Sequence, residues 1–253
     1  MRIVTDFSVT SAPIRARRRW HPGSLFQDGT PGAWYDPSDL STLFQDSAGT
    51  IPVTQADQPV GQMRDKSGNG FHLSQSIAAA RPLYRSAGGL HWLEFDGVDD
   101  RMDFAAPLDM NTGTIIIGFV EPENRSARSA LFSPSNAGFL SLRLEGDART
   151  MSKNDGGNHA LVDTPGSFAM TEQTAAAIRI DGGDIFARRE GGAEHTNSTT
   201  GRDIFALTMF MAFNSVGQLA AAGDFFGAVL HASHLPSGDV DNALRIINAR
   251  MGA

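Results

Sequence analysis

Residues 178–187 read Ile-Arg-Ile-Asp-Gly-Gly-Asp-Ile-Phe-Ala, and this stretch points most directly to the fold class. Apolar residues alternate with other residues on both sides of Asp181-Gly-Gly-Asp184, a sequence that favours a tight turn. The pattern predicts two antiparallel strands joined as a β-hairpin. Leu93-Glu-Phe95 and Arg101-Met-Asp-Phe104, on either side of Asp96-Gly97, predict a second hairpin in the same way.

Short segments of the same character recur along the chain, with Gly, Pro, Asn or Asp between most of them. We expect strands at residues 90–95, 102–104, 114–120, 130–132, 139–144, 176–180, 185–188, 204–213 and 227–233. Many short strands with few helices predict an all-β fold, a jelly-roll β-sandwich. The most apolar segments contain Met209, Phe210, Met211, Phe213, Phe225 and Phe226. We expect them to lie in the core, and a subunit interface is the alternative.

Two helical segments are expected beside the strands. Val240, Leu244, Ile247 and Met251 recur at helical spacing, which predicts a short C-terminal helix. Ser237 or Asp239 could cap its start, and Gly252 could end it. Residues 36–44 could hold a short helical turn capped by Ser38 or Asp36.

Composition excludes several classes of protein and site. The 253 residues contain no cysteine, which excludes disulfides, thiolate metal sites and cysteine catalysis. No stretch approaches the roughly 20 apolar residues of a membrane span, so we expect no membrane insertion. Residues 1–10 lack the apolar core of a signal peptide, which predicts synthesis in the cytoplasm.

Charge is distributed unevenly along the chain. The net charge is −7, which argues against nucleic-acid binding, although residues 1–19 alone carry +4. Residues 1–30 lack a sustained period, so we expect an extended basic arm there and one jelly-roll domain over residues 31–253. Five side chains are candidates for anchoring the arm to a partner protein: Arg15, Arg17, Arg18, Arg19 and Trp20. A solvated basic tail is the alternative.

Three stretches resemble a known group of proteins. They are Ala33-Trp-Tyr-Asp-Pro-Ser-Asp-Leu-Ser-Thr-Leu-Phe-Gln-Asp46, Asp65-Lys-Ser-Gly-Asn-Gly70 with Ala80-Arg-Pro82, and Leu93-Glu-Phe-Asp-Gly-Val-Asp-Asp100. They are similar to stretches of phage and prophage virion proteins that carry a concanavalin A-like, laminin-G-like jelly roll. The likeness covers roughly residues 33–251 and is strongest over residues 33–100.

The resemblance implies a structural protein of the virion and not an enzyme. It would belong to a tail fibre, tail tip, head spike or capsid decoration, with other virion proteins as partners of the arm. We expect a homo-oligomer that presents a lectin-like domain to host cell-surface polysaccharide, since clustered weak sites gain avidity. One alternative is a decoration or connector without ligand. Another is a polysaccharide-degrading glycosidase of the same fold.

One acidic stretch invites tests for catalysis and for a metal. Glu94, Asp96 and Asp99 loosely match the Glu-x-Asp-x-x-Glu string that some glycosidases of this fold use, and alternation places Glu94 and Asp96 on one strand face. Asp96, Asp99 and Asp100, with Asp103, could bind Ca²⁺ through oxygen ligands. Both comparisons favour a structural turn rich in aspartate. We therefore predict no catalytic residues and no required cofactor.

Two polar stretches are expected to form loops at the rim of the sandwich, where binding residues are common. Their candidate ligand-binding residues, suited to sugar hydroxyls, are Asn154, Asp155, Asn158, His159, His195 and Asn197. The three tryptophans, Trp20, Trp34 and Trp92, are expected in the core or at an interface. His231 and His234 would point to opposite faces of a strand, which does not suit two ligands of one metal.

Overall fold

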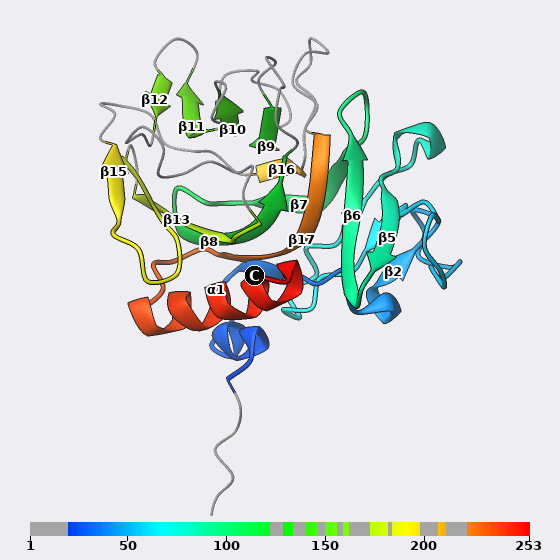
Figure 1. Ribbon diagram of the computed structural model, residues 1–253, viewed down its shortest axis with the longest axis horizontal. Helices are drawn as coiled ribbons and strands as arrows, with labels where there is room; N and C mark the ends of the chain where they lie inside the picture. Colours follow the sequence, from blue (N-terminus) through cyan, green and yellow to red (C-terminus); the bar gives the residue numbers. More distant parts are fainter. Residues whose placement is uncertain are drawn as a thin grey trace, which may run out of the picture.

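The chain folds into two antiparallel β-sheets that face each other, with a helix on the outer side of one sheet (Figure 1). The computed structural model describes residues 20–121, 129–133, 140–145, 150–155, 159–161, 173–181, 184–197, 207–210 and 222–253. The two sheets and the C-terminal helix confirm the expected all-β sandwich. Among the described residues, no helix is long and apolar enough to cross a membrane.

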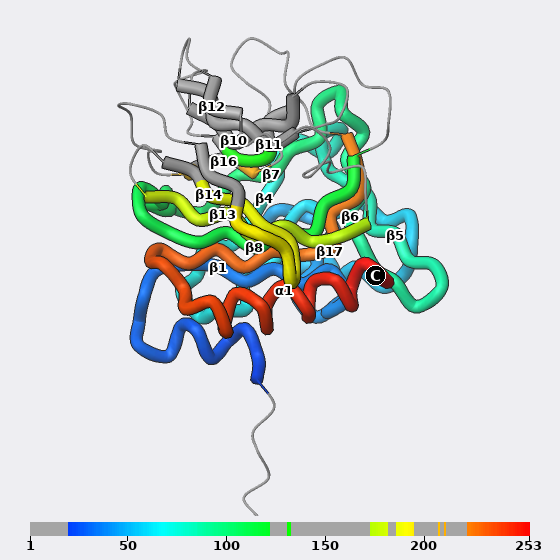
Figure 2. The backbone as a smooth tube through the Cα atoms, turned by 60° about the vertical axis from the view of Figure 1, so that its left-hand side comes forward, coloured from blue at the N-terminus to red at the C-terminus, as the bar shows by residue number. Residues whose placement is uncertain are grey.

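Sheet A carries the helix on its outer face, the face turned away from the other sheet (Figure 2). Its strands pair in the order β15-β14-β13-β8-β17-β6-β5, and β1 also pairs with β17. Their bounds are β1 (Gly32–Tyr35), β5 (Leu83–Ala87), β6 (Leu90–Asp96), β8 (Thr112–Val120), β13 (Ala176–Asp181), β14 (Asp184–Arg188), β15 (His195–Asn197) and β17 (Ala222–His231).

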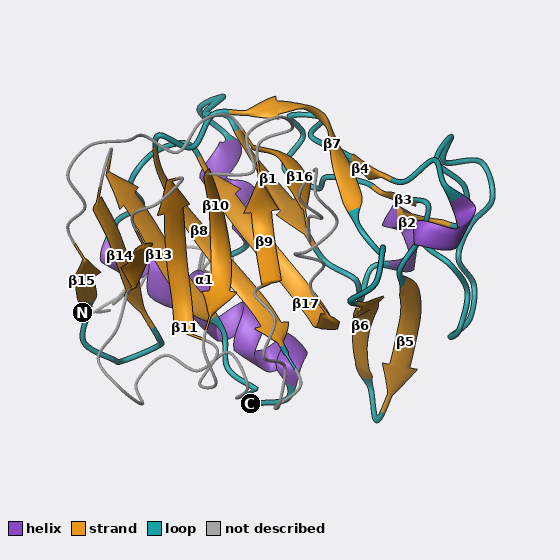
Figure 3. Ribbon diagram, turned by 90° about the horizontal axis from the view of Figure 1, so that it is seen from above, coloured by secondary structure: helices purple, strands orange, loops and turns teal. Residues whose placement is uncertain are grey.

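Sheet B forms the opposite layer, in the order β12-β11-β10-β9-β16-β7-β4-β3-β2 (Figure 3). Its strands are β2 (Leu43–Phe44), β3 (Gln62–Met63), β4 (Leu73–Ser74), β7 (Met102–Leu108), β9 (Ser129–Ser133), β10 (Leu140–Glu145), β11 (Thr150–Asp155), β12 (His159–Leu161) and β16 (Leu207–Phe210). The helices are η1 (Pro22–Phe26), η2 (Leu40–Thr42), η3 (Ala78–Ala80) and α1 (Ser237–Met251).

The expected strands mostly lie where the pattern predicted them, and β13 and β14 form the predicted hairpin with Ile180 opposite Ile185. Of the strand expected over residues 204–213, β16 occupies residues 207–210, and the rest lies outside the described residues. The second predicted hairpin is wrong. β6 pairs with β17 in sheet A, whereas β7 pairs with β4 and β16 in sheet B. The turn that begins at Asp96 therefore carries the chain from one sheet to the other.

The main core lies between the inner faces of the two sheets. Phe210 of β16 lies at its centre, with its ring centroid 4.7 Å from that of Phe225 and 5.2 Å from that of Phe132. Phe226 is also buried, but on the outer face of sheet A. The expected burial is confirmed for Phe210, Phe225 and Phe226, whereas Met211 and Phe213 lie outside the described residues.

A second apolar layer lies between α1 and sheet A. Alternation along β8 turns Ile115 and Ile117 into the main core and Ile116 toward α1. Leu244 and Ile247 of α1 complete this layer. The helix follows Pro236, so the expected caps Ser237 and Asp239 are wrong. Gly252 ends it in the left-handed conformation, as expected.

The short turn in residues 36–44 also differs from its prediction. It is a 3₁₀ turn, η2, whose cap is Asp39 and not Ser38 or Asp36. Asp36 instead accepts hydrogen bonds from Ser38 and forms ion pairs with Lys66 and Arg250. Its carboxylate thus links the start of the domain to α1.

Residues 20–30 pack on the domain. Phe26 of η1 is buried in the layer that holds α1, and the half-buried Trp20 donates a hydrogen bond from Nε1 to Asp239 Oδ1 over 2.9 Å. The four candidate anchoring arginines, Arg15, Arg17, Arg18 and Arg19, lie outside the described residues. The hydrogen bond to Asp239 places Trp20 at the start of α1.

Candidate functional site

A row of side chains crosses the outer face of sheet A near the end of β6. Val120 of β8 pairs with Asp224 of β17, and Asp224 pairs in turn with Glu94 of β6. Residues directly opposite each other in a sheet share a face, so the two carboxyl groups are neighbours. Together with Asp96 they line a cavity of about 430 Å³, which we call the acidic pocket.

Arg85 and Trp92 adjoin the acidic pocket on the same face. They pair across β5 and β6, and Trp92 precedes Glu94 by two residues. Arg85 forms ion pairs with Glu94 and with Asp57. The half-buried Trp92 ring lies 5.8 Å from that of Phe226, so the tryptophan packs on the layer below α1. The indole is therefore held in place beside the carboxylates.

Among the titratable residues that line the acidic pocket, Asp224 has the pKa that its surroundings shift most. Burial raises the pKa of Asp224 to about 6, and the negative charge of Glu94 adds to the rise. A hydrogen bond from the Trp92 side chain and the positive charge of Arg85 both oppose the rise in this pKa. Asp224 therefore changes protonation state close to neutral pH.

This arrangement presents two carboxyl groups in one hollow, with a guanidinium and an indole bonded to them at its edge. Carboxylate oxygens accept hydrogen bonds from hydroxyl groups, and a guanidinium donates them. A few converging polar groups in a concave site, one of them with a perturbed pKa, mark a candidate ligand site. The chemistry suits a ligand with several hydroxyl groups.

The turn after β6 brings together the three weak calcium candidates. Ligand oxygens of Asp96, Asp99 and Asp100 lie within 4.8 Å of one another. Asp96 Oδ1 accepts hydrogen bonds from the backbone N–H groups of Val98, Asp99 and Asp100. Asp100 Oδ2 accepts one from the Asp96 N–H, and burial raises the pKa of Asp100 to about 6. These hydrogen bonds account for the cluster as a turn, which remains the favoured interpretation over calcium.

The structure also places the three acidic residues considered for catalysis. Glu94 and Asp96 share the outer face of β6, as alternation predicted, whereas Asp99 lies in the turn. The carboxyl group facing Glu94 across the sheet belongs to Asp224. The Glu-x-Asp-x-x-Glu pattern therefore contains one member of the carboxyl pair, Glu94, but not the other, Asp224.

The candidate rim residues lie at the far ends of the two sheets. Asn154 and Asp155 end β11, where Asn154 pairs with His159 of β12, and Asn158 lies outside the described residues. The loop expected at residues 195–197 is wrong, because His195–Asn197 forms β15 and pairs with β14. Figure 1 shows β12 and β15 on one side of the molecule, away from β6. These residues and the acidic pocket are therefore separate places.

Trp34, His231 and His234 each contact other parts of the chain. Trp34 is buried, with Lys66 Nζ 4.4 Å from its ring centroid. His231 is buried in β17, with Nε2 3.0 Å from the Leu25 carbonyl oxygen. His234 Nε2 lies 2.9 Å from the Ile180 carbonyl oxygen. Because β17 ends at His231, His234 lies after the strand, and the expected placement of both histidines on opposite faces of one strand is wrong.

The sequence pattern did not indicate Asp224 or Arg85 as site residues, because each is a lone charge in its segment. Asp224 stands in Ala222-Gly-Asp-Phe-Phe226, an otherwise apolar stretch. A charge within a buried strand is an available signal, since unpaired charges are rarely buried. Its partner across the sheet is 130 residues away in the chain, so spacing could not reveal it.

Comparison with known proteins supports the fold of this chain and no finer assignment. No family model matches the chain, and no curated protein matches its sequence. Similar solved structures include domain 4 of AbnA, a GH43 extracellular arabinanase from Geobacillus stearothermophilus in complex with arabinotriose. That domain is 13% identical with a TM-score of 0.56, and the match covers 84% of this chain and 97% of the domain.

Two larger enzymes contain a similar sandwich. A GH54 α-L-arabinofuranosidase matches at 11% identity and a TM-score of 0.62, over 92% of this chain and 66% of that one. A Trypanosoma rangeli sialidase matches at 12% identity and a TM-score of 0.51, over 83% of this chain and 36% of that one. At such identities the likeness shows a jelly-roll-like β-sandwich shared with domains of carbohydrate-active proteins.

Proposed function

We propose that this chain is a carbohydrate-binding β-sandwich that holds a glycan in the acidic pocket without cleaving it. The observation that carries the proposal is the pair Glu94 and Asp224 in a cavity of about 430 Å³, with Arg85 bonded to Glu94 and Trp92 bonded to Asp224 beside it. The arabinotriose bound to domain 4 of the arabinanase supports the ligand class, because that domain has a similar fold. The fold alone would not identify a function.

Glycan-array binding of the full chain tests the proposal. We expect the wild type to bind a subset of neutral polysaccharides. Asp224→Asn combined with Glu94→Gln should weaken that binding by roughly tenfold or more, because hydrogen bonds to charged acceptors are lost. Asp109→Asn is the matched control, since Asp109 is an exposed turn aspartate outside the pocket. A flat array for the wild type, or equal binding by the double variant, would contradict the proposal.

Glycoside hydrolysis is the second candidate, and one observation favours it. Retaining glycosidases place two carboxyl groups about 5–5.5 Å apart, and residues opposite each other across two strands have Cβ atoms at about 4.5–5.5 Å. Glu94, ion-paired with Arg85, would be the nucleophile, and Asp224, with its raised pKa, the general acid. The reducing sugar released from bound polysaccharide measures this activity. Turnover that Glu94→Gln abolishes would establish it, and binding without product would exclude it for the glycans tested.

We further propose that the domain is displayed on a phage-type virion, made in the host cytoplasm and anchored through its basic N-terminal arm. The resemblance of residues 33–100 to virion proteins supports this placement. The position of Trp20 also supports it, because Trp20 bonds to Asp239 at the start of α1, whereas the acidic pocket lies at the end of β6. Assembly as a homo-oligomer would multiply weak sites.

Electron microscopy of particles from the producing strain, labelled with antibody to this chain, tests the placement. Label on a vertex, capsid face or tail tip would support it and choose among spike, decoration and fibre. Soluble protein with unlabelled particles would contradict it while leaving carbohydrate binding intact. Arg17→Glu with Arg18→Glu should reduce incorporation into particles if the arm docks on an acidic partner.

A further inference from the structure

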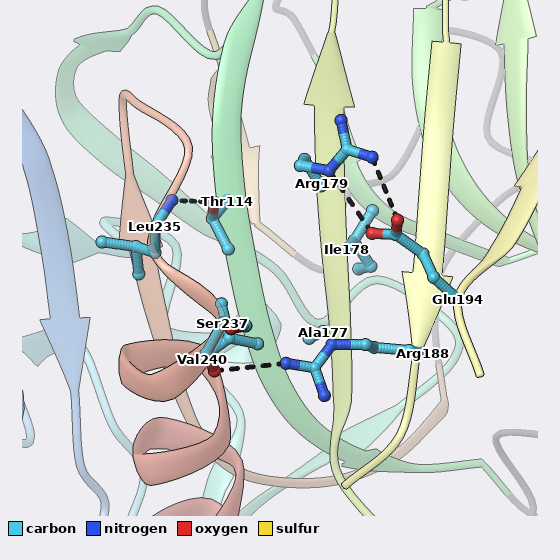
Figure 4. Close-up of a pocket in the computed structure, with 9 residues that line it drawn as sticks. All are labelled: Thr114, Ala177, Ile178, Arg179, Arg188, Glu194, Leu235, Ser237 and Val240. Atoms are coloured by element: carbon cyan, nitrogen blue, oxygen red, sulfur yellow. Dashed lines mark hydrogen bonds and ion pairs between the residues drawn. The ribbon is translucent and has the colours of Figure 1, made fainter. Parts of the chain in front are cut away.

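A second hollow lies on the outer face of sheet A, where α1 begins. It has a volume of about 270 Å³ and is bounded by β13, β14 and the first turn of α1 (Figure 4). Ala177 of β13 and the buried Thr114 of β8 line it from the sheet, and Leu235 and Val240 line it from the helical side. Ala177 leaves the space open because its side chain is a single methyl group. We call this hollow the helix-side pocket.

An ion pair forms one rim of the helix-side pocket. Arg179 donates from Nε and Nη2 to the two carboxylate oxygens of Glu194, over 3.3 and 3.1 Å (Figure 4). The guanidinium also lies 3.5 Å from the centroid of the Phe186 ring, which orients it further. The Arg179 and Glu194 side chains remain 28% and 39% exposed, so both can still reach a ligand.

Both arginines beside the helix-side pocket are paired with carboxylates. Arg188 pairs with Asp241 over 2.6 Å, and Arg179 has Asp181 at 3.9 Å in addition to Glu194. A free anion would have to compete with these three carboxylates for two arginines, which argues against a phosphate or carboxylate ligand. The bidentate pair of Arg179 and Glu194 instead offers donors and acceptors side by side.

We infer that the helix-side pocket is a second binding site for one neutral sugar residue. Neighbouring hydroxyls of a sugar both donate and accept hydrogen bonds, which matches Arg179 beside Glu194. Ala177, Leu235 and Val240 provide an apolar wall for the C–H face of the ring. The volume, at the lower end of small-molecule sites, fits a single ring and not a long chain.

The two pockets are independent sites on one face. Thr114 lines the helix-side pocket and Val120 the acidic pocket, and six residues of strand separate them by about 20 Å. Helix α1 packs on Ile116 and Gly118 between them. One molecule could therefore hold two branches of a glycan surface and gain avidity without an oligomer. This consequence rests on the proposed carbohydrate binding at the acidic pocket, whereas the site itself does not.

Titration of the full-length, ¹⁵N-labelled protein with neutral monosaccharides tests the inference. Glucose, galactose and arabinose are the probes, and glucuronate and acetate are the anionic comparators. A neutral sugar should shift the amide signals of Ala177, Glu194 and Leu235 and the Nε signal of Arg179 in a saturable way. Arg179→Lys should weaken this binding by roughly tenfold, because it loses the planar bidentate geometry. Arg245→Lys, on the exposed side of α1, is the matched control.

Ala177→Leu fills the hollow without changing a charge and should abolish the same shifts. If Ala177→Leu fails to fold, the binding of neutral sugars by Arg179→Lys tests the inference by itself. Neutral sugars that leave these signals unmoved, acetate or glucuronate that shifts them equally, or shifts that survive in Arg179→Lys would overturn the inference. Signals of Glu94 and Asp224 report on the acidic pocket separately, so failure of the second site and failure of the proposed function are distinguishable.

Discussion

Asp65 and Asp224 show how far the behaviour of a carboxyl group depends on its surroundings. Asp65 is buried, and its Oδ1 accepts hydrogen bonds from the N–H groups of Trp34 and Ser67. Its Oδ2 accepts them from the Ser67 hydroxyl and the Phe71 N–H. Asp224 lies beside another carboxylate in a partly buried hollow. The Asp65 carboxylate is thus held by four hydrogen bonds, whereas burial and the neighbouring Glu94 raise the pKa of Asp224.

The raised pKa of Asp224 predicts how its replacement changes stability with pH. The folded chain binds this proton more tightly than the unfolded chain, so the associated stability is present below about pH 4 and is lost as the pH rises to about 6. Asp224→Asn should match the wild type near pH 4. At pH 7 the free energy of unfolding of Asp224→Asn should exceed that of the wild type by about 1 kcal/mol, after allowance for solvent screening.

Urea unfolding at a series of pH values measures this difference. Asp109→Asn is the control, because Asp109 is an exposed turn aspartate away from Asp224. An Asp224→Asn variant that loses stability in parallel with the wild type across this range would contradict the assignment of the proton to Asp224.

The hydrogen bonds of Asp65 predict a large cost for its replacement. Asp65→Asn exchanges one acceptor oxygen for an N–H₂ group that faces donors of Trp34 and Ser67 or of Ser67 and Phe71. We expect the free energy of unfolding to fall by about 2–4 kcal/mol. Thermal or urea unfolding measures the loss, and Asp109→Asn, in an exposed turn, should stay within about 0.5 kcal/mol of the wild type. A comparable loss in both variants would point to a cause other than these hydrogen bonds.

At the level of elements, the position of α1 depends on a glycine in β8 that has no side chain. Gly118 lies under the helix, and a Cβ atom there would approach Ile247 Cγ2 to 2.5 Å and Met251 Sδ to 2.9 Å. The absence of a side chain lets the helix pack closely on the sheet, so that Ile116, Leu244 and Ile247 form a continuous layer. The same packing separates the two pockets on the outer face.

Gly118→Ala should therefore move α1 or strain it. We expect a loss of about 1–3 kcal/mol in the free energy of unfolding, typical of overpacking. Gly238→Ala is the control, since a Cβ at that position in the first turn of α1 has open space. Urea unfolding compares the two, and equal stability of Gly118→Ala and the wild type would show that the helix does not need this close approach.

At the level of the whole molecule, the two sheets share one core. Phe210 of sheet B contacts Phe225 of sheet A, and the helical layer packs on the back of sheet A through β8. An arrangement in which every layer depends on its neighbour predicts cooperative unfolding. One domain over residues 31–253 stays a prediction, and such unfolding would test it.

Unfolding should accordingly be a single transition. Fluorescence of Trp20, Trp34 and Trp92 reports on the helical side, and far-ultraviolet circular dichroism reports on both sheets. The two signals should give coincident urea midpoints. Separate midpoints would show that the helical layer, including residues 20–30, melts before the sandwich, and would place the boundary of the cooperative unit after residue 30.

Several features of this protein followed from its sequence alone because they depend on neighbours in the chain. Alternation and turn residues predicted the β13–β14 hairpin and most of the strands, and helical spacing predicted α1. The sequence also brought Glu94 and Asp96 to attention. Local hydrogen bonding and side-chain direction decide such features, and both can be read within a few residues.

The tertiary structure decided whatever depends on residues far apart. The β6–β7 turn looked like a hairpin, but β6 pairs with β5 and β17 in sheet A and β7 pairs with strands of sheet B. Pairing across the sheet brings Asp224 beside Glu94, and the approach of α1 to β13 and β14 forms the second pocket. The burial that raises the pKa of Asp224 arises from these contacts, because burial belongs to the assembled layers and not to any one segment.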